Sequence, residues 1–295
     1  MDENEKPNLE KPGLSRRFLA PAAGSAAALG ALVFGGRTAM AQGADARAAL
    51  AATSMIEEVK RRNTLRVGMS TFVPWAFRNR AGELIGYEID VANRLAQDLG
   101  VRAEFVPTAW DGIIPALLAG RFDAIIGGMT ITPARNLSAN FTVPYSATGV
   151  DMAANRRLAD GMTTIEAYNR PNVTITGRRG TAGIAAVQRL MPRATIRQFD
   201  DDAQSILEVV NGRAHAMIGS VPRPLFATLD NPDTLFRPFA QPLTRQADAM
   251  AVRKSDPDAL NFLSNWIMLR QLDGWLEERQ AYWFGAREWR DQVPG

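Results

Sequence analysis

Short apolar runs alternate with amphipathic segments along the first half of the chain. The runs typical of buried strands fall at residues 65–68, 104–106 and 124–127. Two segments with apolar residues at helical spacing separate them, one from Val91 to Leu99 before Gly100 and one over 113–118 before Gly120. This order of strand, helix, strand, helix and strand predicts an open, mostly parallel sheet that is covered by helices.

The same pattern returns further along the chain. Strands are predicted at residues 173–176, 194–196 and 216–218, with helices at 184–190 and 203–210 between them. Because the pattern occurs twice, we expect two similar lobes rather than one large sheet. A strand at 249–252 and two C-terminal helices separated by Asp273-Gly274 complete the prediction.

In many two-lobe α/β proteins such a C-terminal segment returns to the first lobe. The chain would then cross between the lobes twice, near residues 149–154 and 247–252, and crossings of this kind act as hinges. We therefore expect lobe 1 to comprise residues 59–151 plus 248–295, and lobe 2 to comprise residues 152–247. Residues 42–58 form a lead segment before the first lobe.

The first 41 residues have the composition of an export signal. A polar stretch is followed by Arg16-Arg17-Phe18-Leu19, an Ala/Gly-rich apolar stretch, and Ala39-Met40-Ala41, which fits a signal peptidase site before Gln42. The arginine pair resembles a twin-arginine signal, although the usual spacer residue before Phe-Leu is missing, so the general secretory route is the alternative. An uncleaved membrane anchor is a further alternative, but the many Ala and Gly residues would make its insertion marginal. We expect an exported, periplasmic protein.

Composition removes most catalytic chemistries. The 295 residues include no cysteine and one histidine, so disulfides, thiolate metal sites, cysteine nucleophiles and multi-histidine metal sites are excluded. Lys and Arg number 34 against 31 Asp and Glu, and the two signs are interleaved, so no nucleic-acid interface is predicted. We expect no metal, no cofactor and no catalytic residue.

Two loops that directly follow predicted strands could bind an anion. Residues 127–135 place glycines, Thr130 and Arg135 after a strand, where an arginine can form a bidentate pair with a carboxylate. Residues 177–183 place glycines and Thr181 before a helix, where backbone N–H groups favour negative charge. Either loop alone could be an ordinary strand-to-helix turn. One in each lobe, together, predicts a small anionic ligand between the lobes.

Other conspicuous residues have a structural interpretation. His215 beside an apolar strand is read as a structural residue, and Asp200-Asp201-Asp202 as a helix cap rather than a metal cluster. The C-terminal aromatic residues are read as core. Phe72 and Trp110 differ, because each follows a predicted strand where a flat ring could cover a ligand's apolar part.

In combination, several segments are similar to the periplasmic solute-binding proteins of polar amino-acid ABC transporters, family 3. The resemblance covers about residues 60–285. Its segments are Leu65-Arg66-Val67-Gly68, Phe72-Val73-Pro74-Trp75, Gly86-Tyr87-Glu88-Ile89-Asp90-Val91-Ala92, Trp110-Asp111-Gly112-Ile113-Ile114-Pro115-Ala116-Leu117, residues 122–135, Phe141-Thr142-Val143-Pro144-Tyr145 and Trp283-Phe284-Gly285.

The resemblance implies a type II periplasmic-binding-protein fold of class α/β, with two open sheets flanked by helices and hinged by two crossing strands. It also implies roles for the residues around the cleft. Phe72 and Trp110 would sandwich the ligand, Gly128 and Thr130 would hydrogen-bond its α-carboxylate, Arg135 would bind that carboxylate bidentately, and Thr181 would add a backbone N–H.

One position departs from the family. Ser220 stands where the family usually places an aspartate that pairs with the ligand's α-ammonium, and a serine cannot supply that charge. The ligand is then either an amino acid held in a different way or a carboxylate without an α-amino group.

The predicted function is that of the substrate-binding component of an ABC importer, which delivers an amino-acid-like or small carboxylate ligand to a permease in the inner membrane. We expect a monomer that closes about its hinge. Two alternatives are open: a periplasmic enzyme resembling cyclohexadienyl dehydratase, which would need an acid in the cleft that residues 181–184 do not provide, and a soluble ligand-sensing module.

Overall fold

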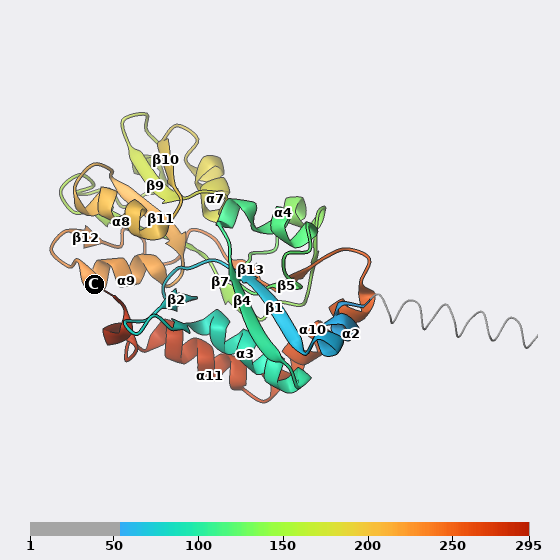
Figure 1. The fold of residues 1–295 in the computed structure, drawn as a ribbon. Coiled ribbons are helices and arrows are strands. Elements are labelled where there is room, and N and C mark those ends of the chain that lie inside the picture. The colour runs from blue at the N-terminus through green and yellow to red at the C-terminus, as the bar shows by residue number, and fades with distance from the viewer. Residues whose placement is uncertain (1–53, 295) are drawn as a thin grey trace, which may run out of the picture. The chain divides into compact units, whose positions relative to one another are not determined.

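The structure is a computed structural model in which residues 54–294 are described (Figure 1). The predicted export signal, and the part of the lead segment before Ser54, lie outside these residues. No helix within 54–294 combines the length and the apolar character needed to cross a membrane.

The first sheet, which is the centre of lobe 1, has five strands in the order β4-β1-β5-β14-β6. These are β1 (Thr64–Met69), β4 (Arg102–Pro107), β5 (Ala124–Ile125), β6 (Asn140–Phe141) and β14 (Ala251–Val252). Strand β1 is parallel to β4 and β5, whereas β14 is antiparallel to β5 and β6. The predicted mostly parallel sheet is therefore confirmed, with β14 and β6 added at one edge, of which β14 alone runs antiparallel to the other strands.

Helices cover both faces of this sheet because its strand residues alternate between two apolar clusters. Ala124 and Ile126 belong to the cluster that contains α3 (Tyr87–Leu99), whereas Ile125 belongs to the cluster that contains α4 (Ile113–Leu118). A short hairpin of β2 (Phe77–Arg78) and β3 (Leu84–Ile85) precedes α3, and the turn η1 (Trp110–Gly112) precedes α4.

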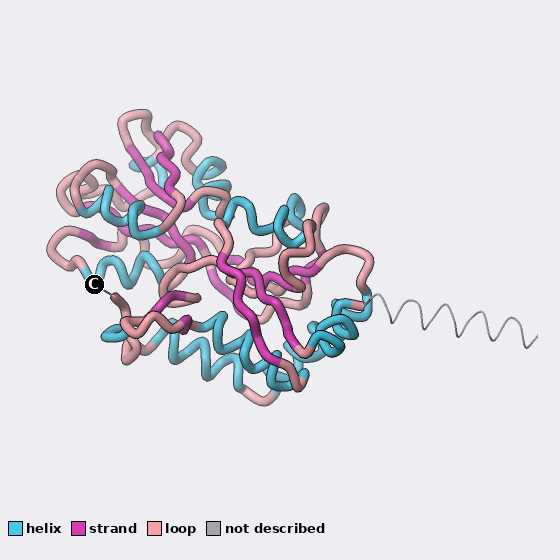
Figure 2. The backbone as a smooth tube through the Cα atoms, viewed as in Figure 1, coloured by secondary structure: helices cyan, strands magenta, loops and turns pink. Residues whose placement is uncertain are grey.

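The second sheet, the centre of lobe 2, has the order β10-β9-β11-β8-β12. Its strands are β8 (Val150–Asn155), β9 (Thr174–Arg178), β10 (Thr195–Phe199), β11 (Ala216–Ser220) and β12 (Leu235–Phe236). Its helices are α6 (Ile165–Tyr168), α7 (Ala182–Leu190), α8 (Asp202–Val210) and α9 (Arg223–Asp230). Alternation again produces two faces, since Ala216 and Ile218 pack with α7 whereas Met217 packs with α8. Figure 2 shows the strands of each sheet bordered by helices.

A separate pair of short strands connects the two lobes. Strand β7 (Ser146–Thr148) pairs antiparallel with β13 (Gln246–Asp248), and the chain continues from them into β8 of lobe 2 and β14 of lobe 1. The prediction of two crossing strands is confirmed, but the crossing begins at Ser146 rather than at 149. The reason is that residues 150–155 already belong to the second sheet.

The C-terminal helices belong to lobe 1. Helix α10 (Pro257–Leu272) is followed by α11 (Trp275–Gln280), a π-helical turn η2 (Ala281–Gly285) and η3 (Arg290–Gln292), while α2 (Met55–Arg62) packs beside α10. Trp266 and Trp283 are buried in the core of this lobe, as predicted.

The last residues of the chain form a tail, residues 286–294, that also reaches lobe 2. Trp289 is buried against Phe77 and Trp283 of lobe 1 and against Phe226 of α9, with ring centroids 5.6 to 5.8 Å apart. Arg287 and Arg290 of the tail form ion pairs with Asp230 at the end of α9, at 2.5 and 2.9 Å. The lobes are therefore joined by the tail as well as by β7 and β13.

Candidate functional site

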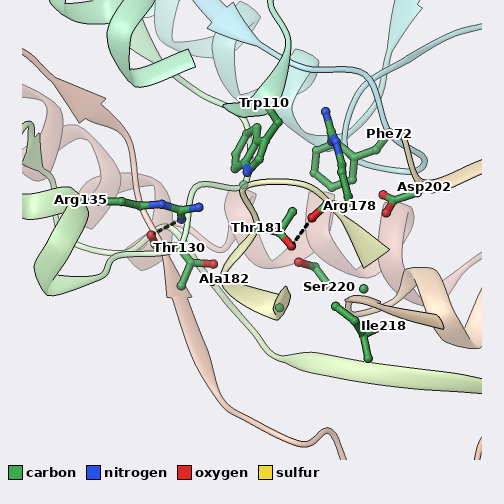
Figure 3. A pocket seen from close by; sticks show the side chains of 13 residues that line it. Phe72, Trp110, Thr130, Arg135, Arg178, Thr181, Ala182, Asp202, Ile218 and Ser220 are labelled. Atoms are coloured by element: carbon green, nitrogen blue, oxygen red, sulfur yellow. Dashed lines mark hydrogen bonds between the residues drawn. The ribbon is translucent and has the colours of Figure 1, made fainter. Parts of the chain in front are cut away.

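A pocket between the two lobes contains all seven residues that the sequence singled out. Its lining residues are Phe72, Trp110, Gly128, Thr130, Arg135, Arg178, Thr181, Ala182, Gly183, Asp202, Ile218, Gly219 and Ser220. Figure 3 shows their side chains pointing toward one another from both lobes. The pocket is narrow, with a cavity volume of about 30 Å³. It can therefore hold a small ligand only if side chains or lobes move.

The pocket residues lie where strands end and helices begin. Gly128 and Thr130 follow β5, Arg178 is the last residue of β9, and Ser220 is the last residue of β11. Strands β1, β4 and β5 are parallel, so their carboxyl ends meet at one edge, and ligands of open α/β sheets bind at that edge. The fold thus accounts for the convergence of residues that are far apart in sequence.

Arg135 reaches across the pocket from lobe 1. It lies in the short helix α5 (Pro133–Asn136), where the Thr132 hydroxyl accepts a hydrogen bond from the Arg135 N–H and caps the helix. Its guanidinium donates to the carbonyl of Thr130 at 2.8 Å and to the carbonyl of Gly180 in lobe 2 at 3.0 Å. A guanidinium has five N–H donors, so three remain for a ligand. Burial lowers the pKa of Arg135, while the nearby Asp248 works in the opposite direction.

Thr130 links the pocket to the hinge strands. Its hydroxyl donates to Asp248 at 2.8 Å and lies 3.2 Å from the Gln246 side chain. Asp248 is buried and also accepts hydrogen bonds from the hydroxyls of Thr148 and Ser146. Burial raises the pKa of Asp248 despite these hydrogen bonds. The Thr130 hydroxyl proton is therefore used by the hinge, and its oxygen is left as the group that can accept from a ligand.

Gly128 is held by a chain of hydrogen bonds that runs into the core. Its N–H donates to the hydroxyl of Tyr145 at 3.1 Å, and that hydroxyl donates to the carboxylate of Glu88 at 2.7 and 2.9 Å. Gly128 has φ of +63°, and a Cβ there would lie 2.9 Å from the Trp75 ring. The residue must be glycine for both reasons. Its N–H is engaged by Tyr145 rather than directed to a ligand.

The start of α7 supplies backbone donors from lobe 2. Thr181 is the N-cap, and its hydroxyl accepts from the Ile184 N–H at 3.4 Å while donating to the Arg178 carbonyl at 2.8 Å. The N–H groups of Ala182 and Gly183 follow in the first turn, which lines the pocket. The first N–H groups of a helix have no partner within the helix and carry the positive end of its dipole. This part of the pocket favours an anion.

Arg178 lies against the two aromatic residues. Its guanidinium carbon is 5.4 Å from the Phe72 ring centroid and 5.5 Å from the Trp110 ring centroid. Its Nη2 donates to the Ser70 hydroxyl across the lobes, and its Nε donates to the Asp200 carbonyl at 3.3 Å. The rings of Phe72 and Trp110, expected to sandwich a ligand, are thus in contact with a cationic side chain of lobe 2 (Figure 3).

Ser220 and Asp202 occupy the lobe 2 side of the pocket. Ser220 brings a hydroxyl, and Asp202, the first residue of α8, brings the one carboxylate that lines the pocket among residues 54–294. Burial raises the pKa of Asp202, while Arg178 and Arg223 work in the opposite direction. A carboxyl group therefore lines the same pocket as Ser220, where the family aspartate is missing, but it comes from another element.

Asp201 and His215, which the sequence analysis interprets as structural, make local contacts within lobe 2. The Asp201 side chain caps α8 by accepting from the Gln204 N–H at 2.8 Å. His215 accepts a hydrogen bond at Nδ1 from the Thr174 N–H at 3.1 Å, and burial lowers its pKa.

Sequence reasoning missed Arg178 and Asp202 as pocket residues. Each lies in a segment that has a different interpretation in the sequence. Arg178 lies in a glycine loop interpreted as a source of backbone N–H donors, and Asp202 lies in a run of aspartates interpreted as a helix cap. The alternation of residues along β9 could have indicated the side of the sheet that Arg178 faces, because successive residues of a strand face opposite sides.

Known proteins resemble most of the described chain. The sequence profile of bacterial extracellular solute-binding proteins, family 3, matches residues 65–286. The L-cystine-binding protein TcyJ of Escherichia coli K12 is 29% identical over 233 residues, which are 79% of this chain and 86% of TcyJ. The cyclohexadienyl dehydratase of Pseudomonas aeruginosa is 24% identical over 235 residues, 79% of this chain and 87% of the enzyme.

A solved structure shows the same fold. It is described as a binding component of an ABC transporter from Wolinella succinogenes in complex with lysine, is 32% identical, and superposes with a TM-score of 0.73. The match covers 78% of this chain and 99% of that chain. The chain belongs to family 3 of the bacterial extracellular solute-binding proteins, with the type II periplasmic-binding-protein fold.

Proposed function

We propose that this protein is the periplasmic substrate-binding component of an ABC importer, which binds an amino acid or a related small carboxylate and delivers it to a permease. One observation carries the proposal: Arg135 and the first N–H groups of α7 face the same narrow pocket from opposite lobes. A carboxylate there would be bound by both lobes at once, so it would favour their closure.

Closure would take place about β7 and β13. We infer that residues 59–151 with 248–295 move as one lobe and residues 152–247 as the other. The closed form would be what the permease recognises. The family is one of extracellular solute-binding proteins, which supports export to the periplasm; the monomeric state and the twin-arginine route are parts of the proposal.

The test is a binding measurement on the purified protein. A thermal-shift screen against amino acids, 2-keto acids and simple carboxylates should find a stabilising ligand, because a hundredfold excess over Kd adds about 2.7 kcal/mol. Arg135→Ala should weaken that ligand about 10- to 100-fold, through the loss of charged hydrogen bonds. Arg121→Ala, at an exposed arginine of lobe 1, is the matched control. Unchanged binding by Arg135→Ala would show that the site is elsewhere.

A dehydratase is the second candidate, and Asp202 is the observation that favours it. A cyclohexadienyl dehydratase needs a carboxylic acid near its substrate, and Asp202 is an acid with a raised pKa in the pocket. We favour binding over turnover because the binding proteins among the relatives are more similar to this chain than the dehydratase is, at 29% and 32% identity against 24%. Turnover of prephenate or arogenate that is lost in Asp202→Asn would reverse this choice.

A further inference from the structure

Arg178 lies beside Phe72 and Trp110, the two rings that the family resemblance expects to sandwich the ligand. It is 6% exposed, and its guanidinium carbon lies over both rings, at 5.4 and 5.5 Å from their centroids. Cations over aromatic faces are attracted by the ring quadrupole, and an arginine held by two rings and the Ser70 hydroxyl is fixed in position. The aromatic side of the pocket therefore presents a positive charge.

No carboxylate makes a direct ion pair with this charge among residues 54–294. Among residues 54–294 Arg178 forms no ion pair within 4.0 Å, and the carboxyl groups of Asp202, Asp201 and Asp111 act on it from longer range. Its Nε and Nη2 donate to protein atoms, whereas no partner within the described chain is found for Nη1. Because Nη1 is not among the fully buried atoms without a partner, it is accessible and can donate to an anionic acceptor in the pocket.

Other donors converge on the same space. The Trp110 indole N–H is buried and has no hydrogen-bond partner among residues 54–294, and Figure 3 shows this nitrogen on the pocket side of the ring. The Arg135 guanidinium carbon lies 5.8 Å from the same Trp110 ring centroid that Arg178 approaches to 5.5 Å. Both guanidinium groups therefore approach the Trp110 ring and line the same pocket.

We propose that Arg178 is a specificity-determining residue that forms a second anion subsite, so that the ligand is a short dicarboxylate, with or without an α-amino group. One carboxylate binds to Arg135 and the start of α7, and the other binds to Arg178. Lysine and arginine are excluded, because their cationic side chains would have to displace Arg178 from the rings or lie beside it. The inference rests on the proposed solute-binding function and adds the class of ligand.

The experiment is isothermal titration of the purified protein with defined probes. Succinate and 2-oxoglutarate test plain dicarboxylates, aspartate and glutamate test amino dicarboxylates, and alanine, lysine and arginine test amino acids without a second carboxylate. We expect the wild type to bind at least one dicarboxylate more tightly than any other probe. Arg178→Gln should weaken that dicarboxylate about 10- to 100-fold and bring its affinity close to that of a monocarboxylate.

A neighbouring arginine provides the control. Arg179 is half-exposed, pairs with Asp200 at the surface and does not line the pocket, so Arg179→Gln removes the same charge from the same loop. It should change the affinity by no more than about twofold. Arg178→Lys keeps the charge without the planar group and should lie between the wild type and Arg178→Gln.

The outcomes separate this inference from the function. Tightest binding of lysine, arginine or alanine by the wild type overturns the inference and leaves the binding function in place, and so does unchanged dicarboxylate affinity in Arg178→Gln. Binding of no probe and of no other amino acid or carboxylate overturns the proposed function itself. If Arg178→Gln does not fold, the charge preference of the wild type and the Arg178→Lys affinity decide the question.

Discussion

Glu88 offers a test of how the core supports the pocket. Its carboxyl group is fully buried, and its two oxygens share the single proton of the Tyr145 hydroxyl, which in turn accepts from the Gly128 N–H. No arginine or lysine within the described chain lies within 4.0 Å of it. Burial raises the pKa of Glu88 from 4.5 to about 8, and the charge of Asp248 adds to this, while the Tyr145 hydrogen bond opposes it.

The direction of the pH dependence follows from this pKa. The folded protein holds a proton on Glu88 that the unfolded chain releases above pH 4.5. The contribution of this proton to the free energy of unfolding is therefore complete below pH 4.5 and is lost as the pH rises through about 8. The slope approaches about 1.4 kcal/mol per pH unit inside this window. Between about pH 5.5 and 7.5 the wild type should therefore lose roughly 2 kcal/mol of unfolding free energy through this residue.

Glu88→Gln replaces the protonated acid by a neutral group of the same shape. We expect urea unfolding at about pH 5.5, 6.5 and 7.5 to show that the unfolding free energy of the variant, relative to that of the wild type, rises by roughly 2 kcal/mol from the lowest to the highest pH. Other buried acids, Asp248 among them, titrate in both proteins and cancel in the comparison. Glu104→Gln, at an exposed position of β4, should run parallel to the wild type. A constant difference between Glu88→Gln and the wild type would refute a raised pKa at Glu88.

Three further predictions concern the charges around the lobes. Ser220→Asp should strengthen the binding of neutral amino acids and weaken that of plain dicarboxylates, measured by titration calorimetry, because it adds a carboxylate to the pocket; the opposite order would contradict the placement of Ser220. Asp123→Asn should cost about 2 kcal/mol in urea unfolding, with ligand Kd unchanged, since the buried Asp123 carboxylate accepts from Arg62 and Arg66. Asp230→Asn should cost less than about 1 kcal/mol, because its ion pairs are partly exposed, but should speed ligand dissociation in stopped-flow measurements; an unchanged rate would show that the tail does not hold the lobes.

The sequence was sufficient to predict the sheets because the signal for them is local. Apolar runs such as 65–68 and 216–218 end close to the observed strands, and glycines such as Gly100 mark the helix ends. The crossing between lobes was placed three residues late, since short strands such as Ser146–Thr148 contain no apolar run to identify them.

The pocket was predicted less completely, because many of its contacts join residues that are far apart in the sequence. Glycine loops and Arg135 could be found by their positions after strands. The position of Arg178 over Phe72 and Trp110 depends on how lobe 2 sits against lobe 1, which no local pattern encodes. The same holds for Asp202, whose capping neighbour Asp201 behaves as the pattern predicts.

The tail over residues 286–294 changes what hinge opening costs. A protein joined by two strands alone can separate its lobes at the expense of pocket contacts only, whereas here Trp289 and the ion pairs of Asp230 must also part from α9. If hinge opening separates these contacts, the open form becomes rarer and higher in energy. A ligand would then be admitted slowly and, once enclosed, retained for longer, so the tail would set the residence time of the bound solute independently of the chemistry that selects it.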